Sequence, residues 1–226
     1  MILPISIIIP VYNAEKYVHE ALQSVINQSI PAAEIIVIND GSTDRTLEII
    51  KNHEADIYFR NNKNQGLSAT LNEGIQCSTQ PYIAFLDADD VWAPHKLETQ
   101  WQHFQQTPDI EISFGLVEQF ISPELPEEIK AGIYCPSQSM RGFMKGTMLV
   151  RRTVFETAGL FDQSAILGDF IDWFARAQEK KILFECLNEV LLYRRLHRES
   201  LSGRHQHRKD FPRLLKKALD RRRQEL

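Results

Sequence analysis

Three carboxylates stand within the four residues Asp87-Ala88-Asp89-Asp90, directly after an apolar run of strand length. Acids this close repel one another unless a cation or solvent offsets their charge. Carboxylate oxygens are hard ligands that suit Mg²⁺ or Mn²⁺. A metal bound to Asp87, Asp89 and phosphate oxygens would neutralise charge on a departing diphosphate. The structural alternative is a solvated helix N-terminus, where the helix dipole favours Asp.

Two more residues with chemical potential stand at the ends of predicted strands. Asp40 follows a β-branched run and precedes Gly41, where its carboxylate can accept hydrogen bonds from a base N–H or a ribose hydroxyl. Tyr12 follows the first strand and can stack on a nucleobase. Each also has a structural explanation, because Asp is common in turns before Gly and an aromatic ring can simply fill space at a strand end.

The elements that must position these residues alternate along the chain between apolar runs of strand length and segments with helical spacing. We expect Ser42 to cap the helix that carries Leu47, and the stretch from Ser122 to Ser139, with its prolines, to be a long loop. The predicted strands are 5–10, 34–40, 57–59 and 82–86, and the predicted helices are 14–28, the segment after Ser42, 67–75 and 95–106.

Alternation of this kind predicts an α/β fold with a mostly parallel sheet covered by helices on both faces. In such sheets, ligands bind beyond the carboxyl ends of the strands. We therefore expect Tyr12, Asp40 and the acids from Asp87 to Asp90 to face one cleft.

The end of the first strand disfavours two nucleotide-binding classes, the sugar nucleotidyltransferases and the NAD-dependent oxidoreductases. It ends in Pro10-Val11-Tyr12-Asn13, where a dinucleotide-binding fold would place a Gly-x-Gly-x-x-Gly cradle and a sugar nucleotidyltransferase a glycine-rich basic loop. A P-loop is also absent from the sequence. Without a glycine cradle, pyrophosphate charge must be met in another way, and a metal is the obvious one.

Taken in order, these motifs resemble glycosyltransferase family 2. The resemblance is close from about residue 5 to about residue 98 and continues more weakly to about residue 200. The motifs that carry it are Ile7 to Asn13, Glu34 to Thr46, Asn64 to Ala69 and Phe85 to Asp90, followed by Gly146 to Arg152, Ala158 to Asp162 and Gly168 to Trp173.

The resemblance implies a GT-A fold in a single domain, with a nucleotide-sugar and metal half at 1–98, an acceptor half at 99–203 and a basic C-terminal helix at 204–226. It implies a metal-dependent, inverting transfer of a sugar from a nucleotide-diphosphate sugar, with UDP the common choice. The acceptor could be a glycan, a lipid-linked intermediate, a peptide or a small molecule, and no nucleic-acid partner is expected.

The same resemblance assigns site residues. Pro10, Tyr12 and Asp40 would line the base and ribose pocket, Glu15 would lie near the donor, and Gly66 would let the backbone approach the nucleotide closely. Asp89 is the more direct ligand of Mn²⁺ or Mg²⁺, and His197 matches a histidine that completes the metal shell in some relatives. The full expected substrate-binding set is Pro10, Val11, Tyr12, Asn13, Glu15, Asp40, Gly66, Asp87 and Ala88, and the metal set is Asp87, Asp89 and His197.

The chain departs from the family pattern after Gly168, where Phe170 stands at the position of the usual catalytic base. Asp169 is our first candidate for the base and Asp172 the second; both can instead be structural residues at a helix start. The alternative function is a catalytically silent, glycosyltransferase-like nucleotide-binding protein.

Composition and charge indicate where in the cell the protein is expected to act. The sequence has 43% hydrophobic residues and a net charge of −4, but the segment from Arg194 to Leu226 holds twelve Lys/Arg against four Asp/Glu. The three cysteines, Cys77, Cys135 and Cys186, are odd in number and far apart, which argues against a disulfide framework. We expect a cytoplasmic protein, with the basic C-terminal helix as a peripheral contact to the anionic inner membrane face.

Overall fold

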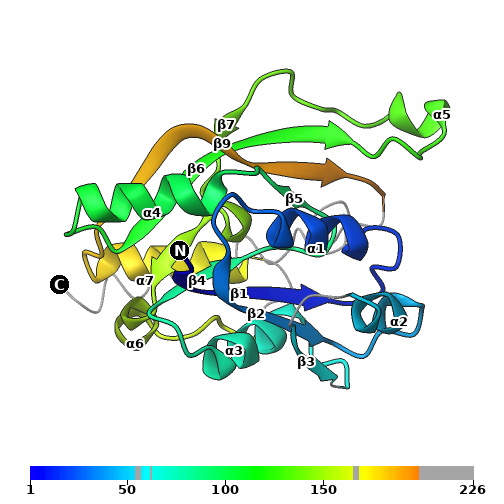
Figure 1. The fold of residues 1–226 in the computed structure, drawn as a ribbon. Helices are drawn as coiled ribbons and strands as arrows, with labels where there is room; N and C mark the ends of the chain where they lie inside the picture. Colours follow the sequence, from blue (N-terminus) through cyan, green and yellow to red (C-terminus); the bar gives the residue numbers. More distant parts are fainter. Residues whose placement is uncertain (54–56, 62, 165–167, 199–226) are drawn as a thin grey trace.

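A computed structural model describes residues 1–53, 57–61, 63–164 and 168–198 (Figure 1). Within these residues the strands form one nine-stranded sheet, in the order β3-β2-β1-β4-β8-β6-β9-β5, with β7 added to β6. Its first half is parallel, as predicted from the apolar runs. It consists of β1 (Leu3–Val11), β2 (Ala32–Asn39), β3 (Tyr58–Asn61) and β4 (Tyr82–Phe85).

The second half makes the sheet mixed. The strand β8 runs antiparallel to β4 and to β6, whereas β9 runs parallel to β6 and antiparallel to β5. This change of direction beside β4 decides which later residues meet the acids from Asp87 to Asp90. The strands are β5 (Val91–Trp92), β6 (Ile112–Ile121), β7 (Met140–Arg141), β8 (Leu149–Arg151) and β9 (Phe184–Leu196).

Helices cover both faces of the sheet (Figure 1). One face packs against α1 (Val18–Ile26), α2 (Thr46–Lys51) and α4 (Lys96–Gln106). The other packs against α3 (Leu67–Cys77), α6 (Thr153–Ala158) and α7 (Asp169–Glu179). A short 3₁₀ turn, η1 (Lys145–Thr147), leads into β8.

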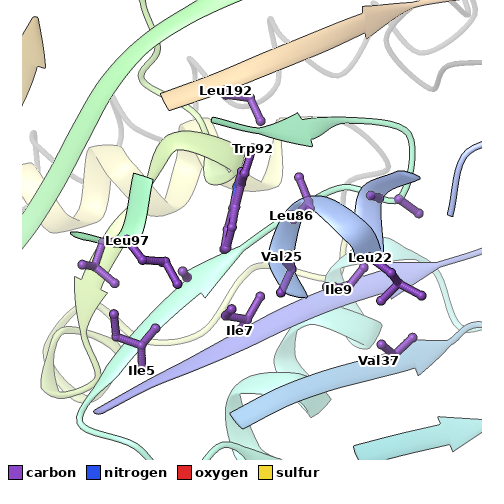
Figure 2. Packing of buried hydrophobic residues seen from close by; sticks show 14 of the residues in the cluster. Ile5, Ile7, Ile9, Leu22, Val25, Val37, Leu86, Trp92, Leu97 and Leu192 are labelled. Atoms are coloured by element: carbon purple, nitrogen blue, oxygen red, sulfur yellow. The ribbon is translucent and has the colours of Figure 1, made fainter. Parts of the chain in front are cut away.

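The core follows from the side-chain alternation of β1. Ile5, Ile7 and Ile9 face α1 and α4, whereas Ile8 faces α3 on the other side. Trp92 packs into the first of these layers together with Leu192 of β9 (Figure 2). Because both faces of β1 are buried, its sequence is a continuous apolar run instead of an alternating one.

Two local predictions differ from the structure. The second helix begins at Thr46, not after a Ser42 cap, because the Ser42 hydroxyl accepts from the Asn13 N–H and donates to the Asn39 side chain. The carboxylate of Asp44 instead accepts from the Thr46 N–H. The irregular stretch from Ser122 to Ser139 contains one short helix, α5 (Glu127–Lys130). The predicted helix at 204–226 lies outside the described residues.

Candidate active site

The candidate active site lies at the carboxyl edge of the parallel half of the sheet, where β1, β2 and β4 end. Asp40 follows β2, and Asp87 follows β4 after one residue. Because β8 is antiparallel to β4, the turn η1 that enters β8 lies beside the end of β4. This topology brings Lys145 of η1 next to Asp87, although no apolar pattern marks it in the sequence.

Asp87 is the electrostatic centre of the site. Its burial raises the pKa of its carboxyl group above the usual value, and the nearby charges of Asp89 and Asp169 raise it further. The cations of Lys145 and Arg194 act in the opposite direction. Two carboxylates of one motif and a third from a distant part of the chain thus share one region with two cations.

His197 and Asp89 form a direct contact, with Nε2 of the imidazole 2.9 Å from Oδ2 of the carboxylate. The His197 side chain is buried and the Asp89 side chain is 30% exposed. Within the described ranges, no three His, Cys, Asp or Glu side chains are already arranged as a metal site. The residues present nevertheless fit a hard divalent cation, because Asp87 and Asp89 crowd each other and His197 adds a nitrogen donor beside them.

The third acid of the cluster, Asp90, has a structural role. It is buried, and its Oδ1 accepts a hydrogen bond of 2.9 Å from the Arg195 backbone N–H. Burial, followed by the charges of Asp89 and Asp87, raises the pKa of Asp90 well above its usual value. Asp90 therefore ties the end of β4 to β9 and turns away from solvent.

Arg195 fixes the same junction with its side chain. The buried guanidinium donates to the Asp89 carbonyl at 3.0 Å and forms an ion pair with Glu20 of α1. It also stacks over the Tyr17 ring, 4.9 Å from its centroid. Sequence reasoning missed Arg195 as a positioning residue, because it stands in a run of basic residues that looks like ordinary charged surface.

Asp169 points into the site. It lies at the start of α7, and its Oδ2 accepts a hydrogen bond of 2.7 Å from Nζ of Lys145. Both side chains are nearly buried, at 8% and 10% exposed. Asp169 also contributes to the electrostatic field at Asp87. The first candidate for the base is therefore placed beside the predicted metal ligands.

Asp172 is engaged in packing instead. Its Oδ2 pairs with Nε of Arg176 at 3.0 Å, and Arg176 also donates to the carbonyls of Ala158 and Leu160. This network joins α7 to the end of α6. The two candidate carboxylates thus have different environments, and that of Asp172 favours the structural explanation.

Phe170, at the position of the usual base, is 8% exposed. Its ring stacks on Phe174 with centroids 5.7 Å apart, and it contacts Trp173 and Phe114. The ring belongs to the aromatic core under α7. The substitution therefore leaves Asp169 as the carboxylate of this segment that faces the other acids.

Asp40 organises the loop before α3. Its Oδ1 accepts from the Gln65 N–H at 2.7 Å and its Oδ2 from the Gly66 N–H at 2.9 Å. Gly66 has φ +89°, which favours glycine, and a Cβ built there would have no atom within 4 Å. Each Asp40 oxygen keeps a second lone pair for a ligand, and the open space at Gly66 suits close approach to a nucleotide.

The loops after β1 and β2 are joined by hydrogen bonds. Asn13, with φ 49°, accepts from the Thr43 N–H through its side chain, and Glu15 accepts from the Arg45 N–H. Tyr12 is 52% exposed at the same edge. The remaining predicted residues of this set, Pro10, Val11 and Ala88, are buried.

Lys145 was not predicted as a site residue. A single lysine in an irregular segment carries no periodicity, and only the adjacent Gly146 belonged to a family motif. In the structure, a Cβ at Gly146 would lie 2.8 Å from the Leu192 side chain, so glycine lets η1 lie against β9. A glycine required for close approach was the available clue that the neighbouring side chain is held in a defined place.

Relatives with similar sequences support one assignment. The chain is 30% identical over 210 residues to an uncharacterized glycosyltransferase of Rickettsia prowazekii, covering 85% of this chain and 64% of that protein. It is 27% identical over 214 residues to an uncharacterized glycosyltransferase of Methanocaldococcus jannaschii, covering 88% and 73%. The chain thus spans slightly less than two thirds of the Rickettsia relative.

The fold has counterparts among solved structures. S. aureus TarS 1–349 in complex with UDP-GlcNAc superimposes with a TM-score of 0.74 at 17% identity, covering 96% of this chain and 65% of that one. The UDP complex gives a TM-score of 0.67 at 18% identity, covering 87% and 62%. This likeness confirms the predicted α/β architecture of the GT-A type.

The family model for glycosyl transferase family 2 matches residues 6–157, which include Tyr12, Asp40, Asp87, Asp89 and Lys145. This match covers more than half of the sequence and agrees with the glycosyltransferase relatives and with the fold. On these grounds the chain belongs to glycosyl transferase family 2.

Proposed function

We propose that this chain transfers a sugar from a UDP-sugar to an acceptor, with inversion at the anomeric carbon and with Mn²⁺ or Mg²⁺ as cofactor. The family assignment supports a sugar transfer, and TarS, a protein of similar fold, was solved with UDP and with UDP-GlcNAc. The expected site follows the order of the chain, with the nucleoside near Tyr12 and Asp40 and the diphosphate near Asp87 and Asp89.

One observation carries the proposal. Asp169, from the second half of the chain, pairs with Lys145, whose turn η1 lies beside the end of β4, and its charge raises the pKa of the Asp87 carboxyl group. A sugar transferase needs a base on the acceptor side within reach of the sugar bound through its diphosphate. The convergence of these three carboxylates supplies both requirements at one edge of the sheet.

Different residues of the chain have different roles in the proposed reaction. Tyr12 and Asp40 hold the nucleoside, and Asp169 accepts the proton of the acceptor hydroxyl on its Oδ1. As that hydroxyl oxygen bonds to the anomeric carbon, the bond from this carbon to the diphosphate oxygen breaks and its electron pair leaves with UDP. A divalent cation held by Asp87, Asp89 and His197 would offset the negative charge of the departing diphosphate.

The alternative, a catalytically silent nucleotide-binding protein, depends on Phe170 at the position of the usual base. That ring is packed among Phe114, Trp173 and Phe174, which gives it a reason to be aromatic that is independent of catalysis. Asp169 offers a carboxylate one residue earlier. We therefore favour the enzyme, and hydrolysis of the donor by water distinguishes it from a silent binder.

The decisive experiment is a screen of nucleotide-sugars in the presence of Mn²⁺, with release of nucleoside diphosphate as the measured quantity. Purified protein should release UDP from at least one UDP-sugar, and faster when a mixture of glycan, lipid-linked, peptide or small-molecule acceptors is added. Release of GDP or dTDP alone would overturn the UDP assignment. Binding of UDP without release from any donor would favour the silent protein.

A further inference from the structure

The ion pair between Lys145 and Asp169 joins the two halves of the site. Nζ of Lys145 lies 2.7 Å from Oδ2 of Asp169, and its turn η1 lies beside the end of β4 that leads to Asp87. Among the described residues, Lys145 is the side chain that the structure places in hydrogen-bond contact with Asp169. It engages Oδ2 and leaves Oδ1 for another partner.

Lys145 is held from behind by a buried polar network. Trp92 donates through Nε1 to the Gly146 carbonyl at 2.8 Å, and Gln100 donates through Nε2 to the Thr147 carbonyl at 2.9 Å. The buried ammonium of Lys96 donates to the Gln100 side chain at 2.7 Å. Trp92 itself is locked in the core shown in Figure 2. The η1 turn therefore has little freedom to move.

The helix α7, which carries Asp169, is also fixed by hydrogen bonds. Trp173, one turn later on α7, donates to the Gly159 carbonyl at 2.9 Å, and the Asp172–Arg176 pair fixes the same helix.

The ring of Phe161 supports Lys145 from another side. The side chain of Asn72 forms hydrogen bonds with both backbone groups of Phe161, each at 2.9 Å, and the Lys145 ammonium lies over the Phe161 ring. Two rigid supports thus present one ammonium to one carboxylate.

Stability does not explain the pair. Taking two charges out of water costs free energy that their attraction only partly repays, and well-packed apolar residues are often as stable. Arg176, which is paired with Asp172, already links α7 to the end of α6 through its hydrogen bond to the Ala158 carbonyl. A second buried pair, placed between the acceptor side and Asp87, is better explained by what it does for the carboxylate.

We propose that Lys145 is a positioning residue: it binds Oδ2 of Asp169 and thereby directs Oδ1 toward the acceptor, beside the acids that hold the donor. This role rests on the proposed sugar transfer and adds a residue to it. A base must lie within hydrogen-bond reach of the proton it removes, and a displacement of about 1 Å can lower the rate on the order of 100-fold.

The test is a double-mutant cycle on the full chain with the best donor found in the screen, Mn²⁺ and the matched acceptor. The variants are Lys145→Met, Lys145→Arg, Asp169→Asn and the double variant Lys145→Met/Asp169→Asn. Lys130→Met, which removes a surface ion pair with Glu127 on α5, is the matched control. For each variant, kcat, acceptor KM and UDP affinity by calorimetry are measured, with a thermal melt to verify folding.

Lys145→Met should lower kcat about 10- to 100-fold with UDP affinity within about threefold of the wild type. Lys145→Arg should recover most of the rate, since it keeps a cation. The double variant should be no slower than Asp169→Asn, because Lys145 acts through that carboxylate. If Lys145→Met does not fold, Lys145→Gln, which keeps a donor without the charge, takes its place with the same expected loss in kcat.

Three results would overturn the role. The first is a normal kcat in folded Lys145→Met or Lys145→Gln. The second is a double variant slowed by the product of the two single losses, which would assign Lys145 an independent action. The third is a UDP affinity that falls in parallel with kcat, which would place Lys145 on the diphosphate. A wild type that releases no nucleoside diphosphate would overturn the proposed function itself and this role with it.

Discussion

Nε2 of His197 lies 2.9 Å from Oδ2 of Asp89, although 108 residues separate the two in the sequence. The contact depends on β9, which pairs with β5 directly after the acid cluster and so returns the chain to it. The pairing of β9 with β5 therefore brings the carboxylate and the imidazole together.

Replacing Asp89 with Ala should abolish turnover and weaken nucleotide binding in the presence of Mn²⁺. The change removes an anionic ligand while the diphosphate charge remains. UDP release and calorimetry measure the two effects. Asp109→Ala, an exposed carboxylate beyond the C-terminal end of α4, is the control. Unchanged turnover with the same Mn²⁺ dependence would remove Asp89 from the metal site.

Asp40→Ala should raise the dissociation constant of UDP roughly tenfold or more, as expected from losing about 1.5–3 kcal/mol in a charge-assisted hydrogen bond. It should also lower the melting temperature, since the N–H groups of Gln65 and Gly66 lose their acceptor. Glu48→Ala, on the exposed side of α2, is the control. Equal affinity would place the nucleoside elsewhere.

Asp169→Asn should slow sugar transfer about 100- to 10,000-fold and leave nucleotide affinity almost unchanged, as is typical when a general base is lost. Asp172→Asn should slow it less and lower thermal stability more, because its partner Arg176 holds two backbone carbonyls. Rates and melting temperatures of both variants test the order. A dead Asp172→Asn with a near-normal Asp169→Asn would reverse it.

Lys96 predicts a pH dependence of stability. Burial lowers the pKa of its ammonium from 10.5 to about 7. Between these values the unfolded chain binds a proton that the folded chain has released, so this residue's contribution to the free energy of unfolding rises with pH. Below about pH 7 the folded chain also keeps the proton, so the cost of burying the charge lowers the free energy of unfolding by its full amount.

Lys96→Met removes this titration. Urea unfolding should show the variant's stability relative to wild type falling by about 1.4 kcal/mol per pH unit between about pH 7.5 and 9.5. The unpaired Gln100 oxygen adds a constant loss at every pH. Lys130→Met, a surface lysine, should show no such slope. A pH-independent difference for Lys96→Met would mean that Lys96 keeps its proton when folded.

The basic segment at 204–226 should give weak, salt-sensitive binding to anionic vesicles. Its apolar residues at Phe211, Leu214, Leu215 and Leu219 recur with helical spacing among Lys and Arg. No helix in the described part of the chain is long and apolar enough to cross a bilayer. Co-sedimentation with anionic and neutral vesicles at low salt measures the effect, and equal binding to both would disprove it.

The sequence predicted the parallel half of the fold well. Ile5, Ile7, Ile8 and Ile9 are buried on both faces of β1, so their continuous run could be identified without knowing the neighbours. The long strand β9 was not predicted, because its burial is irregular and its pairing with β5 and β6 depends on distant residues. An apolar run in the sequence indicates a buried strand, whereas pairing between strands that are distant in the sequence leaves no local sequence pattern.

Candidate site residues could be proposed from the sequence where they closely follow a strand. Asp40 and Asp87 follow β2 and β4, and the structure brings Asp169 and His197 to the second of these ends. Lys145 and Arg195 could not be assigned, because their roles come from contacts across the sheet. The type and spacing of residues identify the acids of a motif. The cations that lie beside these acids in the fold come from distant segments, so their positions depend on how the strands pair.

Arg195 pairs with Glu20, 175 residues earlier in the sequence, so this contact can form only after β9 has been synthesised. A ribosome releases β1, β2 and β4, with Asp40 and Asp89, before α7 and β9 exist. The emerging chain therefore acquires the residues expected to hold the nucleotide first and completes the junction around Asp89 only when β9 arrives. Until then it lacks Asp169 and His197, so a shortened chain ending before α7 keeps the donor residues without the proposed base.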